Sequence, residues 1–389
     1  VTLEQVIALA LEKNYDVRLA KLTEESSALD KKYAATIAFA PQINGSGGIV
    51  WNNSEQELRF QDESRNGEAK SENINASIQL NWVLFDGTKM FATLNRVNSI
   101  AAQGELVVKA QMVNTIAQII SNYYNIVRQK QQLRAIQEQM GVNDERVKLA
   151  EKKLQVGTGG KPELLQAKVD YNAQRTQVIL QEATIVQLKE QLNALVDSKL
   201  PLPFEVADSI ELNLDLKERE IEEQAAASNY TLQGLRLDVE NARLSRWERR
   251  GELSPIVTFN GAYNFSETDN IRLINPFGPL FNQTKGFNFG FGVTVPIFNG
   301  LNAHRQIQQA SISYSRSQTF YDQQKLQVRV DVRNAFVSYQ NAKEILLIEE
   351  ENILLAKENV FIALEGFKRG ITTSIELITA QQSLADAYN

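Results

Sequence analysis

Residues 82–87 read Trp-Val-Leu-Phe-Asp-Gly, and residues 295–300 read Val-Pro-Ile-Phe-Asn-Gly, 213 residues further along the chain. Another glycine follows each stretch after 70 residues, Gly157 in the first copy and Gly370 in the second. A glutamate comes six residues later in both copies. Because the intervening segments have the same length, the sequence predicts a fold built from two similar structural repeats.

Two segments in each repeat alternate apolar and polar residues, the pattern of a strand with two different faces. The clearest are 287–297 and 74–84, and weaker copies lie at 43–51 and 257–265. Their polar faces hold Asn, Gln, Ser, Thr and Gly, with almost no charged side chains. We therefore predict membrane-spanning strands. A face of a soluble β-sandwich is the alternative.

The length of these segments suits a membrane. The two clearest have eleven residues each, which span about 36 Å and, tilted by about 45°, cross about 25 Å of bilayer. Trp51 and Trp82 lie near opposite ends of their predicted strands, where membrane-interface aromatics belong, although core packing is the commoner role of tryptophan. Loops of about 20 residues are expected within each strand pair. The first is charged, and we expect the second, apolar one to fold over a barrel mouth.

Between the strands, the periodicity becomes helical. Apolar residues recur at spacings of four and three over 328–346 and again over 353–367, and a similar stripe covers 113–154. Such stripes predict coiled-coil packing, although a soluble four-helix bundle gives the same pattern. Seventy residues of helix reach about 105 Å. This length favours helical hairpins that project from a membrane.

The predicted strands are too few to close a barrel, and lipid requires closure. Two chains would give eight strands, whose bore is filled by side chains, whereas three would give twelve and can leave a channel. We therefore expect a homotrimer with a shared 12-stranded transmembrane β-barrel.

Composition excludes several classes of function. The net charge is −6, and no basic cluster is interleaved with aromatic residues, so nucleic acid is not an expected partner. The absence of cysteine removes disulfides, thiolate metal sites and a cysteine nucleophile. The only histidine, His304, has no companion for a metal site. We expect no enzyme, no catalytic residue, no metal and no cofactor.

Three features together resemble the TolC-like outer-membrane efflux protein family. They are the opening TLEQVIALALEKN (2–14), the paired stretches at 82–87 and 295–300, and FKRGITTSIELITAQ at 367–381. The resemblance covers essentially the whole chain. It implies a mainly α homotrimer in the outer membrane of a Gram-negative bacterium, with a β-barrel in outer-membrane lipid and a large periplasmic α-barrel of coiled-coil helices.

The resemblance also implies a function. Members serve as exit ducts of tripartite efflux pumps or type I secretion systems, with a periplasmic adaptor (membrane fusion protein) and an inner-membrane transporter as partners. A non-conducting envelope coiled-coil scaffold and a passive outer-membrane porin remain alternatives. The scaffold does not account for the strands, and the porin does not need 70-residue helices.

The family resemblance extends to individual residues near the tip glycines. In the family, acidic residues after the tip constrict the pore, often in the pattern Asp-Val-Leu-Asp. The matching residues here begin with Glu163 and Glu376, and Thr379 replaces the second acid of the second copy. We expect a pore constriction of Glu163, Glu376 and Thr379. The alternative is that each glutamate is an ordinary first-turn residue of a helix.

The tip turns themselves are the expected adaptor-docking residues, although the glycines can equally serve only to reverse the chain. The expected docking residues are Val156, Gly157, Thr158, Arg369, Gly370, Ile371 and Thr372.

The expected domain organisation follows the repeat: 1–196, a linker at 197–216 with two prolines, and 217–389. By the 213-residue offset, Asn389 corresponds to Thr176, yet the first-repeat helical pattern continues to about Val196. We therefore expect the native chain to extend past Asn389 by at least about 20 residues, roughly 30 Å of helix.

Overall fold

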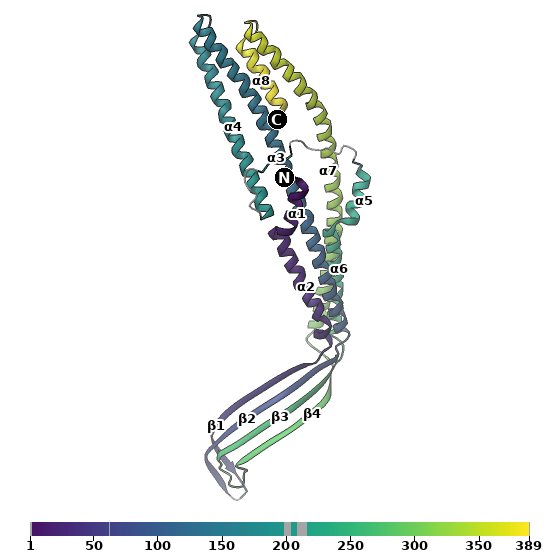
Figure 1. The fold of residues 1–389 in the computed structure, drawn as a ribbon. Helices are drawn as coiled ribbons and strands as arrows, with labels where there is room; N and C mark the ends of the chain where they lie inside the picture. The colour runs from purple at the N-terminus through teal and green to yellow at the C-terminus, as the bar shows by residue number, and fades with distance from the viewer. Residues whose placement is uncertain (1, 62, 198–203, 208–215, 389) are drawn as a thin grey trace. The chain divides into compact units, whose positions relative to one another are not determined.

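The computed structural model describes residues 2–61, 63–197, 204–207 and 216–388. Its elements follow the same order twice, with two helices, two strands and two further helices (Figure 1). The first copy consists of α1 (Leu3–Lys13), α2 (Tyr15–Phe39), β1 (Gln42–Arg59), β2 (Ser64–Phe85), α3 (Lys89–Gln155) and α4 (Lys161–Val196). The second consists of α5 (Glu218–Ser228), α6 (Tyr230–Gly251), β3 (Ile256–Arg272), β4 (Phe281–Thr294), α7 (Asn302–Lys368) and α8 (Ser374–Tyr388).

The two longest helices confirm the prediction of two structural repeats. Both α3 and α7 have 67 residues, and each end of α7 lies 213 residues after the corresponding end of α3. The expected linker at 197–216 falls mostly on 198–203 and 208–215, outside the described residues. Within the described parts of the chain, no helix is both long and apolar enough to cross a bilayer.

Tertiary contacts divide the chain into two units, and each contains parts of both repeats. The helical unit comprises Val1–Glu24, Glu105–Gln233 and Gln323–Asn389. The sheet unit comprises Glu25–Gly104 and Gly234–Asp322.

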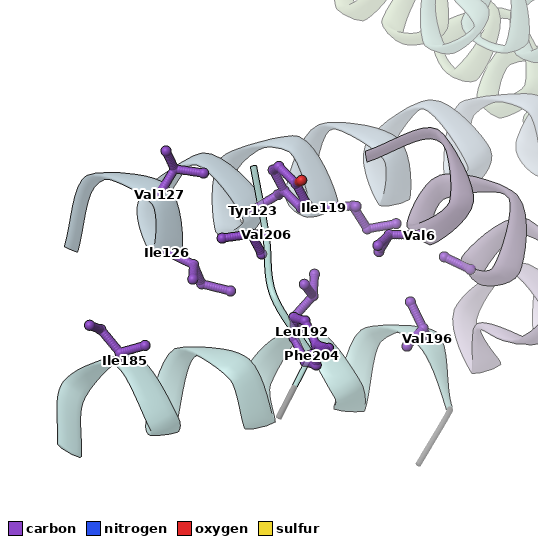
Figure 2. Close-up of a cluster of buried hydrophobic side chains, with 11 residues drawn as sticks. Val6, Ile119, Tyr123, Ile126, Val127, Ile185, Leu192, Val196, Phe204 and Val206 are labelled. Atoms are coloured by element: carbon purple, nitrogen blue, oxygen red, sulfur yellow. The ribbon is translucent and has the colours of Figure 1, made fainter. Parts of the chain in front are cut away.

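The helical unit has a buried apolar cluster where α1, α3 and α4 meet (Figure 2). Helix α3 contributes one stripe at helical spacing, so that its side chains reach both neighbouring helices. The cluster is formed by Val6, Ala10, Ile119, Tyr123, Ile126, Val127, Ile185, Leu192, Val196, Phe204 and Val206. The Tyr123 hydroxyl accepts a hydrogen bond of 2.9 Å from the Ala207 N–H, which satisfies the polar group of this buried ring.

A second cluster in the helical unit joins α7 and α8. It contains Val360, Ala363, Phe367, Leu377, Ala380 and Leu384. Val142 and Leu149 of α3 pack against it. Apolar burial therefore holds the α7–α8 hairpin against α3, at about 1.5–3 kcal/mol for each large side chain.

The sheet unit contains one antiparallel sheet with strand order β1-β2-β3-β4. The strand registers place all the alternating apolar residues on one face. This face carries Ile43, Ile49, Trp51, Ile74, Ile78, Leu80, Trp82, Val257, Phe259, Tyr263, Phe265, Phe287, Phe289, Phe291 and Val293. Four strands with two chemically different faces are therefore confirmed.

The extents of the strands differ from the prediction. The predicted strands 43–51, 74–84 and 257–265 are too short, and 287–297 ends three residues too late, because β4 stops at Thr294. The expected 20-residue loops shrink to 60–63 and 273–280. Alternation in sequence reports the surroundings of the side chains, whereas a ladder is held by backbone hydrogen bonds and continues into water. The charged stretch is accordingly mostly strand.

The stretches 82–87 and 295–300 lead from a strand into a long helix by the same turn. Asp86 Oδ1 accepts from the Met90 N–H at 3.0 Å, and Asn299 Oδ1 accepts from the Ala303 N–H at 3.4 Å. Gly87 has φ +73°, and a Cβ there would overlap the Gly251 carbonyl oxygen. Glycine at 87 is thus required by both conformation and space.

Candidate functional site

The two helical tips, which belong to the helical unit, share one backbone motif. At the first tip, the N–H groups of Gly157 and Thr158 donate to the carbonyls of Leu154 and Lys153 at 3.2 and 2.9 Å. At the second tip, the equivalent bonds, 213 residues later, measure 3.2 and 2.9 Å. This is the Schellman arrangement that ends a helix at a left-handed glycine.

Both tip glycines meet the needs of this motif, and both leave their surroundings open. Gly157 and Gly370 have the same φ of +76°, and a Cβ on either would have no atom within 4 Å. Beside them, Val156 and Ile371 are 72% and 79% exposed. Arg369, Gly370 and Thr158 are exposed as well, and Thr372 is half-buried. Each tip therefore presents apolar surface around a glycine that nothing covers in the single chain.

Below each turn, one glycine faces one side chain, but the roles are exchanged between the tips. A Cβ on Gly159 would lie 2.7 Å from Lys153 Cβ. In the second tip, the glycine is Gly366, at the position that Lys153 holds in the first, and a Cβ on it would overlap Thr372 Oγ1. Thr372 in turn occupies the position of Gly159. The same contact is thus kept free of overlap by opposite choices.

The structure places Glu376 at the start of α8, where it caps the helix. Thr373 Oγ1 accepts from the Glu376 N–H at 3.3 Å, and the Thr373 N–H donates to Glu376 Oε2 at 2.7 Å. These reciprocal bonds form a capping box. The backbone N–H of Thr373, and then its hydroxyl, lower the pKa of the exposed Glu376 carboxyl below its ordinary value. The carboxylate is therefore held in its charged form.

Glu163 starts α4 without such a box, because its N-cap residue is Gly160, which has no side chain to accept a hydrogen bond. Glu163 Oε1 instead lies 3.9 Å from Lys153 Nζ, which also sits 4.4 Å above the Phe367 ring of the second hairpin. Lys153 therefore links the two tips. The two glutamates are equivalent in sequence but not in local bonding.

Thr379, the third expected constriction residue, is exposed on α8, one turn beyond Glu376. Its hydroxyl donates to the Ile375 carbonyl at 3.0 Å, within its own helix. Of the expected constriction residues, Glu376 and Thr379 thus lie on α8 and Glu163 on α4.

A buried polar cluster lies between α3, α4 and α8, and the sequence interpretation did not identify it. Arg146 is 4% exposed and pairs with Asp170 at 3.2 Å. Arg146 also donates to Asn143 Oδ1 at 3.2 Å, and Gln381 of α8 donates to the same oxygen at 3.3 Å. A charge pair this well buried fixes the partners of its helices more strongly than an exposed pair does.

The polar face of the sheet also forms a bonded array. Side chains of neighbouring strands hydrogen-bond across the ladder at 2.8–2.9 Å in the pairs Ser46–Ser77, Ser266–Asn75, Thr268–Asn73 and Asn264–Asn288. Uncharged groups that satisfy one another in this way suit a polar wall, and the apolar face is left for lipid.

The expected interface aromatics lie on the apolar face. Trp82 is near the helix end of β2, and its indole N–H donates to the Phe39 carbonyl at 2.7 Å. Trp51 lies in the middle of β1, not near its end, because β1 continues to Arg59. In register, Trp51 is opposite Glu72, ten residues from Trp82 along β2. This spacing is about 33 Å along the strand.

No group of three or more His, Asp or Glu side chains within the described ranges could hold a metal ion. The residues that sequence interpretation missed are Thr373, the pair Gly366 and Thr372, and Arg146. Only Thr373 had a sequence signal, because Thr-x-x-Glu before an apolar run is the capping-box signature.

A two-faced sheet combined with two long helical hairpins defines a class, the outer-membrane channels with a periplasmic helical part. A sequence model of the family described as "Outer membrane efflux protein" matches residues 6–197 and 221–389, and the chain belongs to this family. The resemblance stated from the sequence is thereby confirmed.

Individual relatives agree with this result. Outer membrane protein TolC of Vibrio cholerae is 21% identical over 380 residues, which cover 95% of this chain and 82% of that protein. Outer membrane efflux protein BepC of Brucella suis is 24% identical over 375 residues, 94% of this chain and 74% of that protein. The solved CmeC outer membrane channel of Campylobacter jejuni is similar in fold, with a TM-score of 0.82 and 17% identity over 99% of this chain and 80% of that one.

The chain is therefore an outer-membrane efflux channel of a Gram-negative bacterium, with its helical part in the periplasm, and not an enzyme.

Proposed function

We propose that three copies of this chain form the exit duct of a tripartite efflux pump, joined to a periplasmic adaptor and an inner-membrane transporter. The observation that carries the proposal is the two-faced sheet with two open edges. In the described part of the chain, β1 and β4 each pair on one side only. Unpaired edges are not tolerated in lipid, and pairing β4 of one copy with β1 of the next closes a barrel without any.

The spacing of the tryptophans supports membrane insertion of this sheet. Ten residues separate Trp82 from the residue opposite Trp51. At a tilt of about 45°, this distance crosses about 23 Å, close to the 25 Å apolar band of outer-membrane barrels. We assign Trp51 and Trp82 to the two membrane interfaces, with the rest of the β1–β2 hairpin outside the membrane.

We assign adaptor docking to the two tips. Support comes from the shared backbone motif, from the open space around Gly157 and Gly370, and from the exposed apolar neighbours Val156 and Ile371. An adaptor that recognises one tip would find the same backbone at the other. The remaining expected docking residues are Thr158, Arg369 and Thr372.

The docking experiment uses asparagine, because it tolerates the left-handed conformation better than other residues with a side chain. Gly157→Asn and Gly370→Asn together keep the turns and add a side chain to each open surface. We expect trimers to form and export to fall. Gly300→Asn is the matched control, because Gly300 has φ +65° and open surroundings but lies in the sheet unit. Full export in the tip variant would place docking elsewhere.

We assign the constriction at the periplasmic end to Glu163, Glu376 and Thr379. Three-fold symmetry would bring six carboxylates toward one axis. The capping box keeps Glu376 charged, which suits a cation-selective ring. The same bonding equally serves the helix end, so a conductance measurement has to decide between the two roles.

Two measurements test the duct itself. The mass in detergent should correspond to three chains of 43.8 kDa each, and a stable folded monomer would remove the shared barrel. In planar bilayers we expect discrete conductance steps. No conductance would favour a coiled-coil scaffold, and export that continues without an adaptor would favour a passive porin.

A further inference from the structure

The β3–β4 connection, residues 273–280, differs in chemistry from the rest of the strand ends. It reads Leu-Ile-Asn-Pro-Phe-Gly-Pro-Leu and contains no charged side chain, whereas the β1–β2 hairpin is densely charged over 55–70. In the single chain, Phe277 is 89% and Leu280 67% exposed. An apolar cluster at the end of a hairpin stays favourable only if something covers it.

This loop has a defined conformation. The Asn270 N–H donates to the Leu280 carbonyl at 2.7 Å, and the Asn270 side-chain amide donates to the Pro279 carbonyl at 2.8 Å. At the tip of the loop, Asn275 Oδ1 accepts from the Phe277 N–H at 3.1 Å. The loop is therefore closed at its base and turned at its tip by side-chain amides.

The loop lies over the polar face of the sheet. A Cβ built on Gly67 would point to this face, and the nearest side-chain atom is Ile274 Cγ1, at 3.9 Å. Leu273, Ile274 and Asn275 enclose a hollow of about 510 Å³. Its opposite wall includes Asn52, Ser54 and Gln56 of β1 and Ala69 and Ser71 of β2. The loop thus stands off the wall on the side that faces the lumen of the proposed barrel.

Barrel geometry indicates what the loop meets there. Twelve strands about 4.8 Å apart, tilted by about 45°, close at a radius of about 13 Å. A layer packed on a sheet lies about 10 Å from it, which brings the backbones of three such loops to about 3 Å from the axis. At this distance the apolar side chains of three copies contact one another.

We infer that the 273–280 loops of three copies form an apolar constriction at the outer mouth of the channel, and that the partner of each loop is the same loop in the neighbouring copies. This inference rests on the trimer proposed above. Apolar constrictions block ions by dewetting and yield when the pore widens. The outer mouth is then closed to small hydrophilic solutes from outside, independently of the periplasmic tips.

Thiol labelling of intact cells tests this inference, because the chain has no cysteine of its own. Ser46→Cys places a thiol on the polar face, inward of the loop, and Gln61→Cys places one at the outer end of the β1–β2 hairpin. The probe is a small, charged, membrane-impermeant methanethiosulfonate added outside. We expect Ser46→Cys to react more slowly than Gln61→Cys, by on the order of tenfold, while the loops close the mouth.

Opening the constriction should remove this difference. Phe277→Ser with Leu280→Ser should speed labelling at Ser46→Cys by a similar factor and leave Gln61→Cys unchanged. Phe60→Ser is the matched control, since Phe60 is an exposed apolar residue, 46% exposed, at the end of the other hairpin, and it should change neither rate. Trimers whose Ser46→Cys rate is the same with both loop sequences would overturn the constriction and leave the duct standing. Monomers in the same preparation would overturn both.

Discussion

Replacing Gly366 with alanine should weaken the second tip, although alanine is the better helix former. Gly366 lies in the last turn of α7. In an open helix interior, the change from glycine to alanine stabilises by about 1 kcal/mol. Here a Cβ would overlap Thr372 Oγ1 and lie 3.1 Å from Thr372 Cβ. Rotating the hydroxyl away leaves the second contact tight, and overpacking of this kind costs about 1–3 kcal/mol.

The net effect should be a loss of about 1–2 kcal/mol at the tip, a factor of about 5–30 in the equilibrium between closed and open turn. Hydrogen exchange of the Ile371 amide reports this opening, because the Ile371 N–H donates to the Gly366 carbonyl at 2.9 Å. Exchange at Ile371 should quicken by that factor in Gly366→Ala. Adding Thr372→Gly removes the overlap and should return most of the protection, as expected for residues in direct contact.

Gly141→Ala provides the control, because Gly141 is an exposed residue in the interior of α3 and a Cβ there would meet nothing within 4 Å. It should slow local exchange. If Gly366→Ala also slowed exchange at Ile371, or if Thr372→Gly gave no recovery, the exchanged glycine contact would not be what shapes the tips.

Three further predictions concern the charged groups of the helical unit. Glu163→Gln with Glu376→Gln should reduce cation selectivity, and reversal potentials unchanged under a salt gradient would make both residues helix-end groups only. The folded pKa of Glu376 lies below its ordinary value of 4.5, so the capping box contributes fully above that value and is lost as the pH falls through the folded pKa. Exchange at the Thr373 amide, relative to Thr158 of the first tip, should therefore rise in acid, and Thr373→Ala should abolish this pH dependence. Asp170→Ala should destabilise by about 3–5 kcal/mol, near the lower end because Asp170 is partly exposed, by leaving Arg146 buried and unpaired, whereas Arg146→Met with Asp170→Leu should cost much less; thermal loss of helical circular dichroism separates the two variants.

Much of the architecture could be predicted from the sequence, because period and spacing reflect the surroundings of side chains directly. Alternation located all four strands, and the 70-residue spacing between glycines predicted two helices of equal length. Strand ends were predicted poorly. Beyond Trp51, β1 carries polar residues on both faces, and no change of face chemistry marks where backbone pairing stops.

The tips could be located but not described in detail. Gly157 and Gly370 announced the turns, because a left-handed helix end favours glycine. The contact between Gly366 and Thr372 depends on how the turn folds back over the helix, which no periodicity encodes. The pairing of Arg146 with Asp170 depends likewise on the register between α3 and α4. The roles of Glu163, Glu376 and Thr379 in a pore stay predictions.

The equal length of α3 and α7 constrains how this protein can change over generations. A single inserted residue moves a helix tip by about 1.5 Å and turns it by about 100°, which would remove that tip from any surface shared with its counterpart. A whole heptad keeps the packing face but shifts the tip by about 10 Å. Such a change is tolerable only when both helices make it together. The two halves of the gene are therefore bound to a common ruler, and a lengthening acquired in one half persists only if the other half acquires it as well.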